Sequence, residues 1–317
     1  MVYYSFLLLT CVCCVMSVQV RQITEPLFLG EGPHWDHRKQ ALYFVTLGQF
    51  NNNMIHKYVL ATGVHTMTRI QGRIGFIVPV QGTCDQFLLG VDRQFQVVRW
   101  NGQNGSPATV LRIIGEVDRN VLGTSINDGK VDPRGRVFAG TISPGIYPVF
   151  IMNQGSLYRL NRSNITKVQD RITVSNGLAW DLRRKAMYYV DSWEWKIRRY
   201  DYDVKTGAIS NLTYIFDFKK NNVEGFPDGM TIDKNGNLWV ACFEGGKVIK
   251  VNPRTGDMLQ EVPIPAKQVT SVTFGGPNFD ILFVTSANFY FRGPQDGATF
   301  MVTGLGVKGL PNRSFKL

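Results

Sequence analysis

The stretch Glu224-Gly-Phe-Pro-Asp-Gly-Met-Thr-Ile-Asp-Lys-Asn-Gly-Asn-Leu-Trp-Val-Ala-Cys-Phe-Glu244 contains the basic unit of the fold. Pro227, Asp228 and Gly229 favour a turn, because Pro fixes φ, Asp bonds its own backbone and Gly accepts positive φ. Asn235-Gly236 is a strong hairpin signal. The apolar run 238–243 is short and rich in β-branched and aromatic residues, which predicts a buried strand. The stretch therefore predicts a polar turn, carrying Asp228, at the mouth of a sheet.

Working outward from this stretch, strands recur with a period of about fifty residues. Apolar strand centres lie at six positions whose spacings are 45, 50, 50, 51 and 44 residues: Tyr43, Leu88, Phe138, Tyr188, Trp239 and Phe283. Before several of them a strand ends in Asp and a short polar turn follows, as at Asp36, Asp132, Asp181 and Asp233. Each such segment is typical of the inner hairpin of a four-stranded blade.

Repeats of 40 to 50 residues that are rich in short strands indicate a β-propeller. A lone blade cannot cover both of its apolar faces, so neighbouring blades stack in a ring around a central channel. We predict an all-β, six-bladed propeller that forms a single domain over residues 18–317, with segment 304–309 helping to close the ring. A β-sandwich is the alternative, but it seldom gives six evenly spaced hairpins.

Composition excludes several classes of function. The 317 residues are 44% hydrophobic and carry a net charge of +11. A nucleic-acid partner would require a basic stripe and a recognisable module, whereas Lys and Arg are scattered here, so we expect none. There is also no G-x-S-x-G elbow, P-loop or dinucleotide fingerprint.

The N-terminal segment differs from the rest of the chain. The apolar run 6–16, followed by Ser17, resembles a secretory signal over residues 1–17, and it is shorter than the ~20 apolar residues of a membrane span. Only Cys84 and Cys242 lie beyond it, so no disulfide framework is expected. Five glycosylation sequons also favour secretion; they begin at Asn104, Asn161, Asn164, Asn211 and Asn312. We expect a secreted monomer without a stable membrane span, or a cytoplasmic protein if the segment is not a signal.

Four turn motifs carry a carboxylate or an amide next to Gly at one phase of the repeat. They are Leu29-Gly-Glu31-Gly-Pro33, Ser125-Ile-Asn127-Asp128-Gly129, Ser175-Asn176-Gly177-Leu178 and Pro227-Asp228-Gly229-Met230. In a propeller these turns converge on one end of the channel. Glu31, Asn176 and Asp228 would then supply three oxygen ligands from three blades. Oxygen ligands suit a hard divalent cation, so we expect Ca²⁺ as the first choice, with Zn²⁺, Mn²⁺ or Mg²⁺ as alternatives.

The chain resembles the regucalcin/gluconolactonase family of six-bladed, cation-binding propellers over roughly residues 25 to 310. Besides the four motifs above, the matching stretches are Tyr189-Val-Asp-Ser192, Leu238-Trp-Val-Ala-Cys242 and Gly304-Leu-Gly-Val-Lys-Gly309. The resemblance implies that Glu31, Asn176 and Asp228 bind the metal and that Asp228 is also the general base. It further implies that Ser125, Asn127 and Asp128 lie at the substrate.

One residue departs from the family pattern. Members that hydrolyse sugar lactones resemble Arg-x-Asn-Asp-Gly where this chain has Ser125-Ile-Asn127-Asp128-Gly129. An arginine there orients a polyhydroxylated lactone by charge-assisted hydrogen bonds, and its loss should weaken sugar-lactone binding. The resemblance predicts a metal-dependent hydrolase of a small lactone or ester. The alternatives are a non-catalytic secreted metal- or ligand-binding protein and an aryl-ester or organophosphate hydrolase on the same scaffold.

Overall fold

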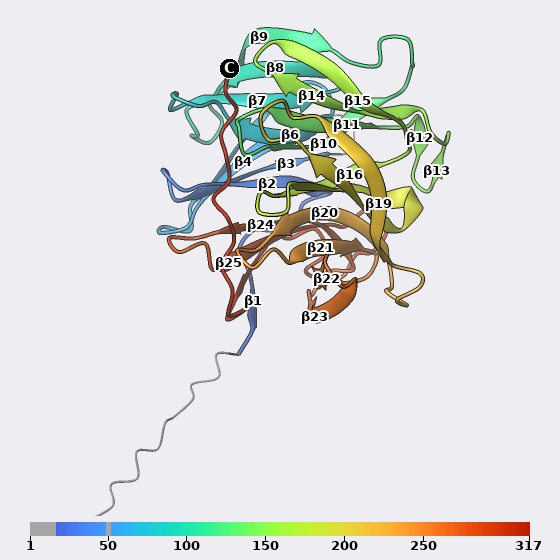
Figure 1. The fold of residues 1–317 in the computed structure, drawn as a ribbon. Helices are drawn as coiled ribbons and strands as arrows, with labels where there is room; N and C mark the ends of the chain where they lie inside the picture. Colours follow the sequence, from blue (N-terminus) through green and yellow to red (C-terminus); the bar gives the residue numbers. More distant parts are fainter. Residues whose placement is uncertain (1–16, 49–51) are drawn as a thin grey trace, which may run out of the picture.

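A computed structural model describes residues 17–48 and 52–317. In it, six four-stranded antiparallel sheets surround a central channel, and each sheet is one blade (Figure 1). The predicted six-bladed β-propeller is thus confirmed. The signal predicted at residues 1–17 lies outside the described residues except for Ser17.

In blades 1 to 5 the strands follow the chain order from the channel outward. Blade 1 contains β2 (Gly30–Asp36), β3 (Ala41–Thr46), β4 (Met54–Val59) and β5 (His65–Arg69). Blade 2 contains β6 (Ile74–Pro79), β7 (Gln86–Val91), β8 (Gln94–Arg99) and β9 (Thr109–Glu116). Blade 3 contains β10 (Ser125–Val131), β11 (Val137–Ile142), β14 (Gly155–Asn161) and β15 (Asn164–Ile172), with the added hairpin β12 (Gly145–Ile146) and β13 (Val149–Phe150).

The second half of the ring repeats this order. Blade 4 contains β16 (Ser175–Asp181), β17 (Ala186–Asp191), β18 (Lys196–Tyr202) and β19 (Ile209–Asp217), with the 3-10 helix η2 (Ser192–Glu194) after β17. Blade 5 contains β20 (Phe226–Ile232), β21 (Leu238–Phe243), β22 (Lys247–Asn252) and β23 (Asp257–Pro263). Blade 6 contains β24 (Gln268–Gly275), β25 (Ile281–Ala287), β26 (Phe300–Thr303) and, as its outermost strand, β1 (Gln19–Gln22).

The six strand centres predicted from the repeat all lie on the second strand of a blade. These strands, β3, β7, β11, β17, β21 and β25, are almost entirely buried. They are buried because both faces of a blade pack against neighbouring blades. This is why their sequences are continuous apolar runs rather than alternating ones.

The N-terminal and C-terminal segments contribute to the ring in different ways. β1 pairs with β26, so the N-terminal strand completes blade 6. The tail after β26 runs across one end of the channel from blade 6 to blade 2 (Figure 1). There Phe315 is fully buried, its N–H donates to Pro79 O, and its carbonyl accepts from Gln81 N. The tail therefore ties blades together, but strand pairing closes the ring through β1.

The two cysteines of the described residues form no disulfide. Cys242 is buried and Cys84 is exposed, and both are free. Burial raises the pKa of the Cys242 thiol, which makes it unreactive. No helix in the described part of the chain is long and apolar enough to cross a membrane.

Candidate functional site

The polar motifs lie within the innermost strands, at the end of the channel opposite the C-terminal tail. The sequence placed them in turns before the strands, and this local assignment is wrong. Each innermost strand contains a β-bulge near its start, where one or more residues are not paired with the second strand of the blade. Asn127, Asn176 and Asp228 all lie in such a bulge, and Glu31 immediately precedes one. A bulge redirects side chains, so the strand backbone itself turns these groups toward the channel end.

The glycines of the motifs permit close packing of neighbouring innermost strands. A Cβ on Gly177 would lie 2.5 Å from Met230 Cβ, and one on Gly229 would lie 1.9 Å from Ser271 Oγ. Each glycine therefore adjoins the next blade in the ring. This explains why an amide or carboxylate is followed by Gly at one phase of the repeat.

Five of the six predicted site residues line one cavity of about 440 Å³: Glu31, Ser125, Asn127, Asn176 and Asp228. Asp128, the sixth, lines a separate cavity of about 20 Å³ beside Lys130 and Met230. Its Oδ1 accepts from Gly129 N at 2.7 Å. Asp128 therefore faces away from the large cavity and acts on it through its charge.

Hydrogen bonds orient the amides of the site. Asn127 Nδ2 donates to Ser175 O at 2.9 Å and to Asn176 Oδ1 at 3.4 Å. Asn176 Nδ2 donates to Ser192 Oγ at 2.8 Å. Since its nitrogen is held by Ser192, the carboxamide of Asn176 presents its oxygen on the side of Asn127.

The carboxyl groups are buried and repel one another. Burial, followed by the charge of Asp128, raises the pKa of Glu31 to about 8. Burial raises the pKa of Asp228 well above its usual range, and the charges of Glu31 and Asp128 add to this. Asp228 Oδ1 is buried and has no hydrogen-bond partner in the described residues.

These residues fit a divalent cation. A cation would add positive charge beside two neighbouring buried carboxyl groups, and it would give Asp228 Oδ1 a partner. Two carboxylates and an amide oxygen form the kind of donor set that hard cations prefer. Residues 17–48 and 52–317 contain no group of three His, Cys, Asp or Glu side chains suited to a metal. A cation here would therefore depend on the amide of Asn176 as well.

One charged residue that lines the cavity, Arg73, was not predicted from the sequence. It lies directly before β6 and donates to Ser125 Oγ and, at 3.0 Å, to Asn127 Oδ1. Burial lowers its pKa to about 10, which the charges of Glu31 and Asp92 partly oppose. The site thus has a positively charged group even though position 125 is Ser. Its only sequence signal is its place directly before an innermost strand, close to the strand start at which the other motifs lie.

Comparisons with known proteins agree with this architecture. The family model for the SMP-30/Gluconolactonase/LRE-like region matches residues 29–288. Regucalcin from Xenopus laevis is 36% identical over 301 residues, covering 92% of this chain and 96% of that protein. Regucalcin from Homo sapiens is 35% identical over 298 residues, covering 90% of this chain and 94% of that protein. The structure of a luciferin-regenerating enzyme has a TM-score of 0.89 and 37% identity, covering 95% of this chain and all of that one. The chain belongs to the SMP-30/gluconolactonase/LRE-like family.

Proposed function

We propose that the protein is a divalent-cation-dependent hydrolase of a lactone or related carboxylic ester. The observation that carries this proposal is Asp228, a buried carboxyl group whose Oδ1 has no hydrogen-bond partner among the described residues. Asp228 and Glu31 both line a cavity large enough for a small molecule. The family's description includes gluconolactonase, which supports the reaction class.

Glu31, Asn176 and Asp228 would hold the cation. When bound, a divalent cation supplies positive charge that polarises an ester carbonyl. Its charge would also keep Glu31 and Asp228 ionised near neutral pH, against the burial that raises their pKa. Ca²⁺ is our first choice because all three ligands are oxygens.

Asp228 and Arg73 have separate roles in this proposal. We assign Asp228 to accept a proton from the attacking water, a step that typically contributes 10²–10⁴-fold to a rate. Arg73 orients the substrate by donating hydrogen bonds to its oxygens, and Asn127, whose Nδ2 already donates to Ser175 O and Asn176 Oδ1, holds the guanidinium through its Oδ1. Arg73 is suited to this because it already contacts both Ser125 and Asn127.

The test is hydrolysis of a panel of γ- and δ-lactones by the purified protein. We expect turnover to be lost with EDTA and to return when Ca²⁺, Mn²⁺, Mg²⁺ or Zn²⁺ is added. Asp228→Asn should lower kcat at least 100-fold, whereas Asp257→Asn, on the exposed strand β23, should leave it unchanged. Turnover that is insensitive to both EDTA and Asp228→Asn would contradict the proposal. Cation binding by calorimetry without turnover of any lactone would favour the non-catalytic alternative.

We further propose that the protein is exported as a monomer after removal of residues 1–17. Support comes from the apolar N-terminal run and from sequons whose asparagines are exposed at Asn104, Asn161, Asn164 and Asn211. Expression in cultured eukaryotic cells tests this proposal. We expect a glycosidase-sensitive protein in the medium that lacks residues 1–17 and has the mass of a monomer. Retention of the unprocessed chain in the cytoplasm would overturn it.

A further inference from the structure

An aromatic wall lines part of the cavity. We use this name for six side chains that line the cavity: Tyr147, Phe150, Trp193, Phe226, Phe243 and Phe289. They come from four consecutive blades. The first two belong to the hairpin β12–β13, which blade 3 inserts between β11 and β14. The wall therefore requires an addition to the regular four-stranded blade.

Tyr147 is the centre of this wall. Its ring makes edge-to-face contacts with Phe243 at 5.5 Å and Trp193 at 5.9 Å between centroids. It makes similar contacts with Phe289 at 6.2 Å and Phe226 at 6.3 Å. All five rings are partly exposed. Since each of them lines the cavity, the wall presents aromatic surface to whatever occupies it.

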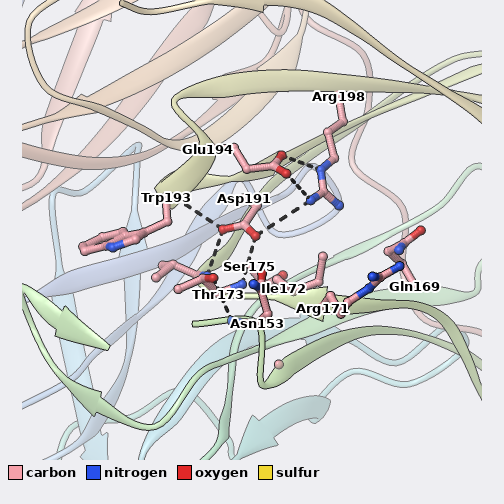
Figure 2. Close-up of polar contacts among 12 residues, drawn as sticks. Asn153, Gln169, Arg171, Ile172, Thr173, Ser175, Asp191, Trp193, Glu194 and Arg198 are labelled. Carbon is pink, nitrogen blue, oxygen red and sulfur yellow. Dashed lines mark hydrogen bonds and ion pairs between the residues drawn. The ribbon is translucent and has the colours of Figure 1, made fainter. Parts of the chain in front are cut away.

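Polar contacts hold Trp193 in place (Figure 2). The carboxylate of Asp191 accepts from Thr173 N and Val174 N, both at 2.9 Å, and from Trp193 N at 3.4 Å. It thereby caps η2, the helix that carries Trp193. The indole points away from this polar cluster in Figure 2 and stacks on Phe226 at 5.3 Å with the planes 15° apart. A ring fixed in this way provides a preorganised stacking surface.

The cavity thus has two chemically distinct sides. Glu31, Arg73, Asn127, Asn176 and Asp228 are polar and come from the innermost strands or the residue before one. The wall is aromatic over six side chains, and four of them are phenylalanines without any hydrogen-bonding group. A polyhydroxylated sugar lactone would place hydroxyl groups against these phenylalanine rings, where they find no partner, which is unfavourable. A planar aromatic ring would instead gain dispersion and edge-to-face contacts there.

We propose that the natural substrate is a lactone or ester that carries an aromatic ring. The ring packs on the aromatic wall while the ester group reaches Asp228 and Arg73. This inference rests on the proposed hydrolase function for the reaction, but its recognition element is separate. The volume of about 440 Å³ is ample for a two-ring molecule.

A binding experiment tests the wall without any turnover. The probes are 3,4-dihydro-2-quinolinone and δ-valerolactam, two unreactive cyclic amides that differ by a fused benzene ring, with affinity measured by calorimetry on the full chain. We expect the aromatic probe to bind at least tenfold more tightly. Trp193→Ala should remove most of this preference, and Phe226→Leu, which keeps an apolar side chain, should reduce it. Phe291→Ala is the matched control, because Phe291 is 41% exposed and does not line the cavity.

Turnover separates this inference from the proposed function. We expect dihydrocoumarin to have a kcat/KM at least tenfold above that of glucono-δ-lactone, with the loss in Trp193→Ala appearing mainly in KM. Preference for the sugar lactone, or equal binding of the two amides, would overturn the aromatic wall as a recognition site. Tight binding of the aromatic amide without hydrolysis of any lactone would overturn the hydrolase function and leave the wall standing.

Discussion

The buried ion pair between Asp132 and Arg136 gives the sharpest test of how neighbouring blades are joined. Asp132 is in the inner turn of blade 3, and Arg136 Nε donates to its Oδ2 at 2.6 Å. Arg136 also donates to Tyr202 Oη at 2.8 Å, to Val204 O at 2.9 Å and to Lys205 O at 3.0 Å. Tyr202 Oη donates in turn to Asp132 Oδ2 at 2.7 Å. These contacts connect blade 3 to the last strands of blade 4.

The expected magnitude follows from burial. The side chains of Asp132 and Arg136 are 0% and 4% exposed. Arg136→Met keeps the volume but leaves the carboxylate without its counter-charge, and this typically costs about 3–5 kcal/mol. Arg199 and Asp201 make an equally short contact of 2.6 Å, but their side chains are 29% and 44% exposed. Arg199→Met should therefore cost less than about 1 kcal/mol.

The assay is denaturant unfolding of both variants and of the double variant Asp132→Asn/Arg136→Met. We expect the double variant to be more stable than Arg136→Met, because it removes the unpaired charge. Equal losses for Arg136→Met and Arg199→Met would refute the argument that burial decides the strength of the pair. A double variant less stable than Arg136→Met would also refute it.

Three further predictions test the ends of the channel and blade 1. Burial lowers the pKa of His56 to about 3, whereas its pKa in the unfolded chain is near 6.5. The contribution of His56 to stability is therefore complete above pH 6.5 and falls by about 2 kcal/mol at pH 5. In His56→Gln, this part of the pH dependence of the free energy of unfolding should disappear. Phe315→Ala should cost about 3–5 kcal/mol because the ring is fully buried, whereas Leu317→Ala, at an exposed position, should not change the unfolding midpoint. Ser125→Arg places a second guanidinium beside Arg73, so the melting temperature and the lactone turnover should both fall. Both should recover in the double variant Ser125→Arg/Arg73→Ala. A gain of either in the single variant would contradict this placement.

The sequence by itself determined the architecture of this protein. The spacing of apolar runs located the second strand of every blade, from Tyr43 to Phe283, because a strand covered on both faces must be apolar along its length. The same periodicity placed Glu31, Asn176 and Asp228 at one phase of the repeat. Residues at one phase of a ring must reach one end of its channel, so their presence in a common cavity was predictable.

Only the tertiary structure decided how the site is completed. The bulges depend on how neighbouring innermost strands pack, so the local turn signals at Asp228 and Asn176 were misassigned. Arg73 carries no motif, and it enters the site through contacts with Ser125 and Asn127, which follow it in the chain by 52 and 54 residues. The aromatic wall joins rings from four blades, and no local pattern relates Tyr147 to Phe289. Periodicity fixes which end of the channel a residue approaches, but the direction of its side chain depends on packing between blades.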